Sequence, residues 1–155
     1  MERTEIENRI RAAIEILKLN DEETIVDGNE RAVGHKLACY IAPLFNDWDV
    51  DYEYTRTGLD DDVKRDFNEK IRSPDIIIHK RKKTELSKNL VIIEVKIKNK
   101  PSKSDIEKLT DFTRLPRGDK RKFQYQYGLS ISFKPNGQFI WFENGERTNQ
   151  KQFDL

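Results

Sequence analysis

Two acidic residues and a lysine lie in two short apolar runs of this sequence. Asp75 directly precedes the isoleucines at 76–78, and Glu94 and Lys96 lie within the apolar run 90–97. Side chains alternate between the two faces of a strand, so Glu94 and Lys96 are expected to point the same way. Burying such groups is costly unless they pair or bind a metal. Two carboxylates on neighbouring strands can hold Mg²⁺, which takes oxygen ligands, and a lysine beside them can position or deprotonate a water or neutralise a phosphate.

This motif resembles that of the PD-(D/E)xK nuclease superfamily, whose fold is restriction-endonuclease-like. Pro74-Asp75 is followed, after eighteen residues, by Glu94-Val95-Lys96. The resemblance covers roughly residues 29–143 as an order of elements rather than as residue identity. It implies that Asp75, Glu94 and the main-chain carbonyl of Val95 bind Mg²⁺, with Mn²⁺ as a substitute, while Lys96 assists the attacking water.

The same resemblance implies hydrolysis of a phosphodiester bond, with DNA rather than RNA as the expected substrate. It also implies a 5′-phosphate and a 3′-hydroxyl as the products. Many enzymes of the superfamily cut two strands as dimers, so a homodimer remains open, although no interface is legible in this sequence.

The motif also has interpretations that involve no catalysis. Glu94 and Lys96 can form a surface salt bridge, with Asp75 as a turn or capping residue. Alternatively, the chain can be a nucleic-acid- or protein-binding domain with a nuclease-like fold, part of a larger phage, defence or repair complex. The intact set of Asp75, Glu94 and Lys96 favours the nuclease over this second alternative.

Glu30 is a further candidate for the metal site and for catalysis. It opens a helix predicted over 29–45 and lies seven residues before Leu37, about 700° round the helix, so both residues share the face toward the sheet. The superfamily often has a glutamate on this helix that reaches the metal, and Glu30 is the matching position. The alternative is a capping box formed by Asp27 and Glu30.

Basic residues near the motif strands are candidates for nucleic-acid binding, because affinity for a phosphate backbone comes mainly from lysine and arginine. A run of charge is more commonly a solvated face, and the nearby motif is what favours binding here. The candidates are Lys98, Lys100, Lys108, Arg56, His79 and Arg81.

Hydrophobic periodicity predicts helices and strands in one domain over residues 1–155, of the α/β (α+β) class. The resemblance implies that they form a central mixed β-sheet flanked by helices. The expected core order is α-β-β-β-α-β, with an extra N-terminal helix and a C-terminal hairpin strand. A capping box at Ser104 is expected to open the third helix. The expected helices are 4–19, 29–45 and 104–115, and strands are expected at 48–55, in the two motif runs, at 123–133 and at 139–142.

Composition limits the remaining choices. The 155 residues suffice for one core, and 37% of them are charged. The formal net charge of +1 gives no signal for nucleic-acid binding. The single cysteine, Cys39, rules out a disulfide framework within the chain and is expected to be a small buried hydrophobe. The acidic, amphipathic N-terminus and the lack of a long apolar run predict a soluble cytoplasmic protein with no membrane partner.

Overall fold

The computed structural model describes residues 1–54, 73–83, 85–98, 100–114 and 124–153 of the chain. These residues form three α-helices, two short 3-10 helices and six strands. The 3-10 helices are Ala42–Leu44, which directly follows the second α-helix, and Leu86–Lys88, which leads into the third strand. Arg56 lies outside the described residues.

The six described strands form one sheet in which the order in space follows the order in the chain. The strands are β1 (Asp49–Tyr52), β2 (Ile76–His79), β3 (Asn89–Lys98), β4 (Tyr127–Lys134), β5 (Gly137–Glu143) and β6 (Glu146–Phe153). Only β3 and β4 are parallel, and the other neighbours are antiparallel. The connection between the two parallel strands contains α3 (Lys103–Thr113), because parallel strands need a long crossover. The mixed sheet confirms the predicted fold class.

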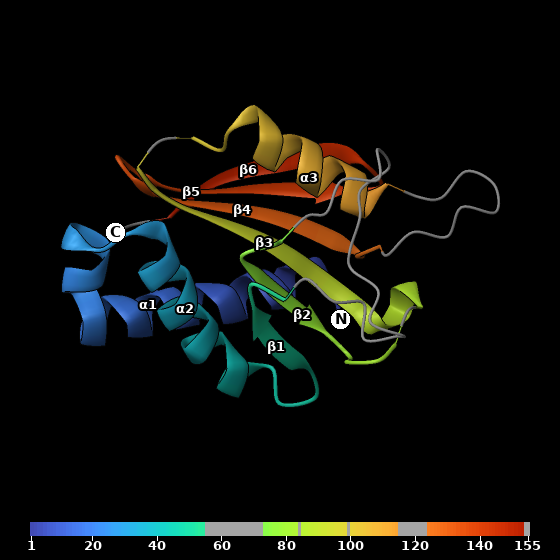
Figure 1. Cartoon of the computed structure of the whole chain (residues 1–155), viewed down its shortest axis with the longest axis horizontal. Coiled ribbons are helices and arrows are strands. Elements are labelled where there is room, and N and C mark those ends of the chain that lie inside the picture. The colour runs from blue at the N-terminus through green and yellow to red at the C-terminus, as the bar shows by residue number, and fades with distance from the viewer. Residues whose placement is uncertain (55–72, 84, 99, 115–123, 154–155) are drawn as a thin grey trace.

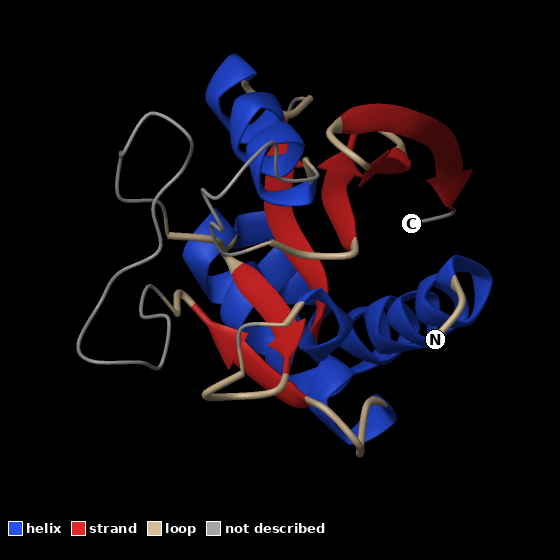
Figure 2. Cartoon of the chain, turned by 90° about the vertical axis from the view of Figure 1, so that its right-hand side faces the viewer, coloured by secondary structure: helices blue, strands red, loops and turns tan. Residues whose placement is uncertain are grey.

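Helices cover both faces of this sheet (Figures 1 and 2). α1 (Arg3–Asp27) and α2 (Glu30–Ile41) share one face, and α3 lies on the other. α1 forms because its apolar residues recur every three or four positions, and these residues are buried against the sheet. They are Ile6, Ile10, Ala13, Ile14 and Leu17. No helix among the described residues has the length and apolar character needed to cross a membrane.

Strand β3 divides the apolar core into two parts. Val91, Ile93 and Val95 belong to the larger cluster, beneath α1 and α2. Ile92 belongs to a smaller cluster with Leu109 of α3. Glu94 and Lys96 follow Ile92 at the strand period of two, so they continue along the α3 face where its apolar cover ends.

Several element boundaries differ from the sequence-based expectations. α1 extends to Asp27, with a non-helical conformation at Asp21, and the capping residue of α3 is Ser102 instead of Ser104. Strand β6 was not expected, because most of its residues are polar and exposed. It is an edge strand that pairs along β5, so backbone hydrogen bonds substitute for the missing apolar pattern. Cys39 is exposed, so the expectation that it is buried was wrong.

Candidate functional site

The side chain of Asp75 is hydrogen-bonded to the strand that carries Glu94. Its Oδ2 accepts a hydrogen bond of 2.7 Å from the main-chain N–H of Val95. The ladder between β2 and β3 ends at the pair Ile76 and Ile93, so this side-chain bond extends the pairing beyond the end of β2. The N–H and C=O of one strand residue point to the same side, so the Val95 carbonyl also faces the edge where Asp75 lies.

Glu94 is buried beneath α3 and is paired with a lysine from that helix. Its side chain is only 2% exposed, and its Oε1 lies 2.8 Å from Nζ of Lys108. The same ammonium group donates to the main-chain carbonyl of Ser73 at 2.9 Å. Lys108 therefore joins α3 to Glu94 and to the segment that leads into Asp75. We refer to Asp75, Glu94, Lys96 and Lys108 as the Asp75–Glu94 site.

Lys96 contacts two carboxylates on opposite sides of the site. Its Nζ lies 3.1 Å from Oε2 of Glu30 and 3.4 Å from Oδ2 of Asp105. The structure thus brings Glu30 to the site, as the helical phase predicted, although its side chain is largely exposed. The capping-box alternative for Glu30 is wrong, because Asn29 caps α2 by accepting a hydrogen bond from the Ala32 N–H.

Asp105 also lies beside the Asp75–Glu94 site, and it was not identified as a candidate from the sequence. It completes a capping box with Ser102. The spacing of Asp105, Lys108 and Leu109 would have placed all three on one helix face, with Leu109 directed at the core. That periodic signal could have located Lys108 and Asp105 beside the sheet. It could not have identified which strand residues they meet.

The carboxyl groups of half-buried Asp75 and buried Glu94 both have raised pKa values. Burial, followed by the negative charge of Asp75, raises the pKa of Glu94 to about 8, against the opposing effect of Lys108. Burial also raises the pKa of Asp75, despite the hydrogen bond from Val95 and the charges of Lys108 and Lys96. Both carboxyl groups thus lack enough positive partners to offset their loss of water.

The flanking groups behave differently. Burial alone would raise the pKa of Asp105, but the hydrogen bonds from Ser102 lower it below its usual value. Burial opposes the charge of Lys96, yet the hydrogen bond to Glu30 and the charge of Asp105 raise its pKa on balance. Lys96 is therefore an ammonium cation at neutral pH.

A strip of buried hydroxyl groups continues the polar face onto β4. Ser130 and Ser132 pair in register with Glu94 and Lys96, respectively. Both serines are buried, and their Oγ atoms have no hydrogen-bond partner among the described residues. Because strand partners in register project to the same face, the hydroxyls lie alongside the charged groups beneath α3.

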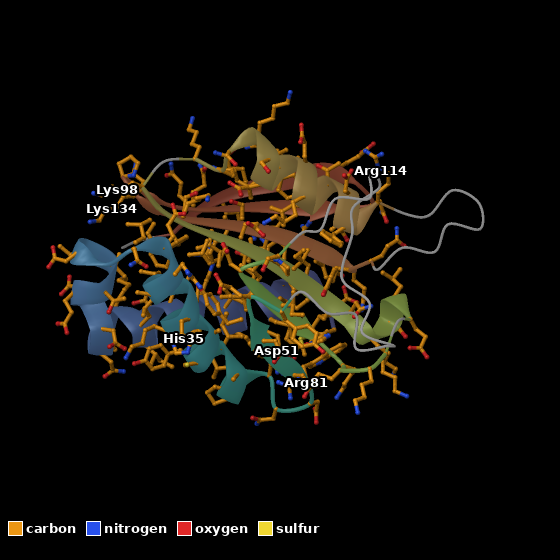
Figure 3. All side chains as sticks on the ribbon, viewed as in Figure 1. His35, Asp51, Arg81, Lys98, Arg114 and Lys134 are labelled. Atoms are coloured by element: carbon orange, nitrogen blue, oxygen red, sulfur yellow. The ribbon has the colours of Figure 1, made fainter. Side chains whose placement is uncertain are left out.

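The predicted nucleic-acid-binding residues that the structure describes lie in different surroundings. Lys98 and Lys100 are exposed, and Lys98 pairs in register with Lys134 at the end of the parallel strands (Figure 3). Lys108 lies within the Asp75–Glu94 site instead. These lysines are close in sequence but belong to different surroundings.

His79 and Arg81 bind a carboxylate of β1. His79 is 1% exposed, and its Nε2 lies 2.8 Å from Oδ2 of Asp51. Arg81 makes a two-pronged contact with the same carboxylate, using Nε and a terminal guanidinium nitrogen. His79 is thus held inside the protein and is not available to nucleic acid, which corrects the prediction for this residue. Asp51, His79 and Arg81 are referred to as the Asp51 cluster.

The donors around Asp75 suit a hard divalent cation. The carboxylates of Asp75 and Glu94 and the Val95 carbonyl are all oxygen ligands, and Mg²⁺ commonly takes one or two protein carboxylates and keeps several waters. In the described part of the chain, no three acidic, histidine or cysteine side chains gather into a group that could hold a metal. Glu30 contacts the site through Lys96, and its assignment as a metal ligand stays a prediction.

Comparison of the chain with protein-family models, with curated proteins and with solved structures found no match. The residues of the site and their geometry are therefore the basis for a proposed function.

Proposed function

We propose that this protein is a metal-dependent nuclease of the PD-(D/E)xK type. The observation that supports this most directly is the pair of half-buried Asp75 and buried Glu94, which lies at the junction of β2 and β3 beside Lys96 and Lys108. A structural salt bridge would balance its charges internally. Here burial raises the pKa values of both carboxyl groups despite Lys108, so an added cation would stabilise their charged forms.

In this proposal, Asp75, Glu94 and the Val95 carbonyl hold the metal ion. A bound Mg²⁺ would polarise a phosphoryl oxygen and lower the pKa of a water next to the scissile phosphate. The hydrogen bond from the Val95 N–H fixes the orientation of the Asp75 carboxylate. This leaves Asp75 Oδ1 as the oxygen not committed to that bond.

Lys96 is proposed to act as a charge rather than as a base. Its raised pKa keeps it protonated, so it can orient the attacking water or stabilise negative charge on the phosphate but cannot accept a proton. Glu30 and Asp105 hold the ammonium group between them and so position it. The exposed Lys98 is a candidate for contact with the flanking phosphate backbone, and DNA is the expected substrate.

The test is cleavage of labelled single-stranded, double-stranded and branched DNA, and of RNA, with Mg²⁺, Mn²⁺ or EDTA. Asp75→Asn is expected to lower the rate by about a thousandfold or more, because several kcal/mol of metal-dependent stabilisation would be lost. Lys96→Met is expected to lower it by about a hundredfold or more. Lys103→Met removes an exposed charge from α3 and serves as the matched control.

Cleavage that persists in EDTA, or that Asp75→Asn leaves intact, would contradict the proposal. If folded wild-type protein binds nucleic acid or protein but cuts no substrate, the chain belongs to the non-catalytic alternative. Metal calorimetry on the same preparations then shows whether Asp75 and Glu94 bind an ion at all.

A further inference from the structure

Lys108 is the lysine of the Asp75–Glu94 site that pairs directly with Glu94. Its ammonium group lies 2.8 Å from a Glu94 oxygen and 2.9 Å from the Ser73 carbonyl, and its side chain is only 12% exposed. The ammonium group thus stands beside the carboxylate on which the proposed function depends. Lys96, in contrast, makes its contacts with Glu30 and Asp105.

The attachment of α3 to the sheet has other sources besides Lys108. Leu109 and Phe112 pack into the apolar cluster of that face, and the Ser102–Asp105 capping box fixes the start of the helix. Lys108 supplies something these contacts do not, which is a positive charge for a carboxylate that is 2% exposed. A buried carboxylate without such a partner would be strongly disfavoured in its charged form.

A divalent cation and an ammonium group repel each other when they share one carboxylate. The Lys108 side chain is long and unbranched, and it starts from a partly exposed position on α3. It can therefore change rotamer without displacing Leu109 from the core. Because the two cations repel each other, Lys108 opposes the arrival of the metal ion.

We propose that Lys108 is a displaceable counter-ion, which pairs with the ionised Glu94 carboxylate in the metal-free protein and must leave this carboxylate when a divalent cation binds. The proposal rests on the metal site of the proposed function. Lys108 keeps the two carboxylates assembled before metal arrives, and it raises the metal concentration at which the site fills. It is a positioning residue in this role and not a catalytic one.

The experiment is calorimetric titration of the full chain with Mg²⁺ and with Mn²⁺, without nucleic acid. It is run at about pH 8.5 to limit competition from protons, because the pKa of Glu94 is about 8. Lys108→Met is expected to bind either ion at least about tenfold more tightly than wild type, because a nearby positive charge is removed. Lys108→Arg keeps the charge and is expected to bind as wild type does.

Lys103→Met is the matched control, since it removes a lysine from the same helix whose side chain is 92% exposed. It is expected to leave the metal affinity unchanged. If Lys108→Met does not fold, Lys108→Gln replaces it, because glutamine is neutral and can still donate to the Ser73 carbonyl.

Equal or weaker metal binding by Lys108→Met would overturn the inference. If Asp75→Asn loses metal binding in the same series, the metal site itself stands and only the role of Lys108 fails. If neither wild type nor Lys108→Met binds metal, both the inference and the proposed function fail. If Lys103→Met and Lys108→Met bind metal equally tightly, the gain in affinity comes from the change in net charge and not from the position of Lys108. That result would also overturn the inference.

Discussion

Strand β2 has a carboxylate cluster near each end, and the two clusters differ in how their charges are balanced. Near the start of β2, the effect of burial on the pKa values exceeds the opposing effect of the nearby hydrogen-bond donors and lysines. The pKa values of Asp75 and Glu94 are therefore raised. Near its finish, burial would also raise the pKa of Asp51, but hydrogen bonds from His79 and Arg81 lower it far below its usual value. Burial thus acts the same way in both places, and the number of directed partners decides the outcome.

This difference separates a structural cluster from a candidate site. In the Asp51 cluster, both carboxylate oxygens are bonded, and His79 and Arg81 tie β1 to β2 and to the residues that follow it. In the Asp75–Glu94 site, the strongest ion pair of Glu94 is a single lysine contact. Raised carboxyl pKa values next to positive groups are typical of functional sites. A carboxylate with hydrogen bonds to both oxygens, and with a lowered pKa, is typical of a contact that stabilises strand pairing.

The largest expected effect concerns the pH dependence of stability. The pKa of Glu94 is about 8 in the folded chain and 4.5 as a free side chain, so the folded chain binds more protons between these values. The free energy of unfolding should therefore fall as pH rises through this window, by up to about 1.4 kcal/mol per pH unit. Glu94→Gln should remove most of this fall, as measured by urea denaturation across the window.

Asp51→Asn is the control for this comparison. Because the pKa of Asp51 is lowered, its contribution to stability is complete above 3.8 and is lost only as pH falls below that value. It should not alter the slope between 4.5 and 8. A wild-type slope no steeper than that of Glu94→Gln would show that Glu94 titrates normally, and the contrast between the two clusters would disappear.

A smaller effect is expected when the Asp51 cluster itself is broken. Asp51→Asn should lower the free energy of unfolding near neutral pH by about 2–3 kcal/mol, because His79 is buried and Arg81 loses one carboxylate partner and keeps Asp49. Asp47→Asn, an exposed carboxylate that lies just before β1, is the matched control. A loss no larger than that of the control would mean that the cluster does not lock the strands.

The smallest effect is expected for Arg81→Lys, which keeps the charge but not the two-pronged geometry. Half of the Arg81 side chain is exposed, so solvent screens the pair, and a loss of about 1 kcal/mol is expected. Thermal denaturation beside the Asp51→Asn protein measures it. A loss of stability as large as that of Asp51→Asn would show that the two-pronged geometry of Arg81, and not its charge, stabilises the cluster.

The sequence by itself determined the local arrangement of the motif. The period of a strand places Glu94 and Lys96 on one face, and the period of a helix places Glu30 on the face of its helix that carries Leu37. Local hydrophobic patterns also predict the three helices and most of the strands, whereas the mixed sheet was implied by the resemblance. The local features are predictable because each depends on residues that are close together in the chain.

The tertiary structure alone decided which charges meet. Lys108 was predicted to contact nucleic acid, and Asp105 was not a candidate, yet the packing of α3 places Lys108 against Glu94 and Asp105 against Lys96. His79 has the strand phase of Asp75, but pairing of β1 with β2 buries it against Asp51. Such partners depend on how helices dock and strands pair across long sequence separations. Local periodicity gives the face of an element, and only packing determines what that face touches.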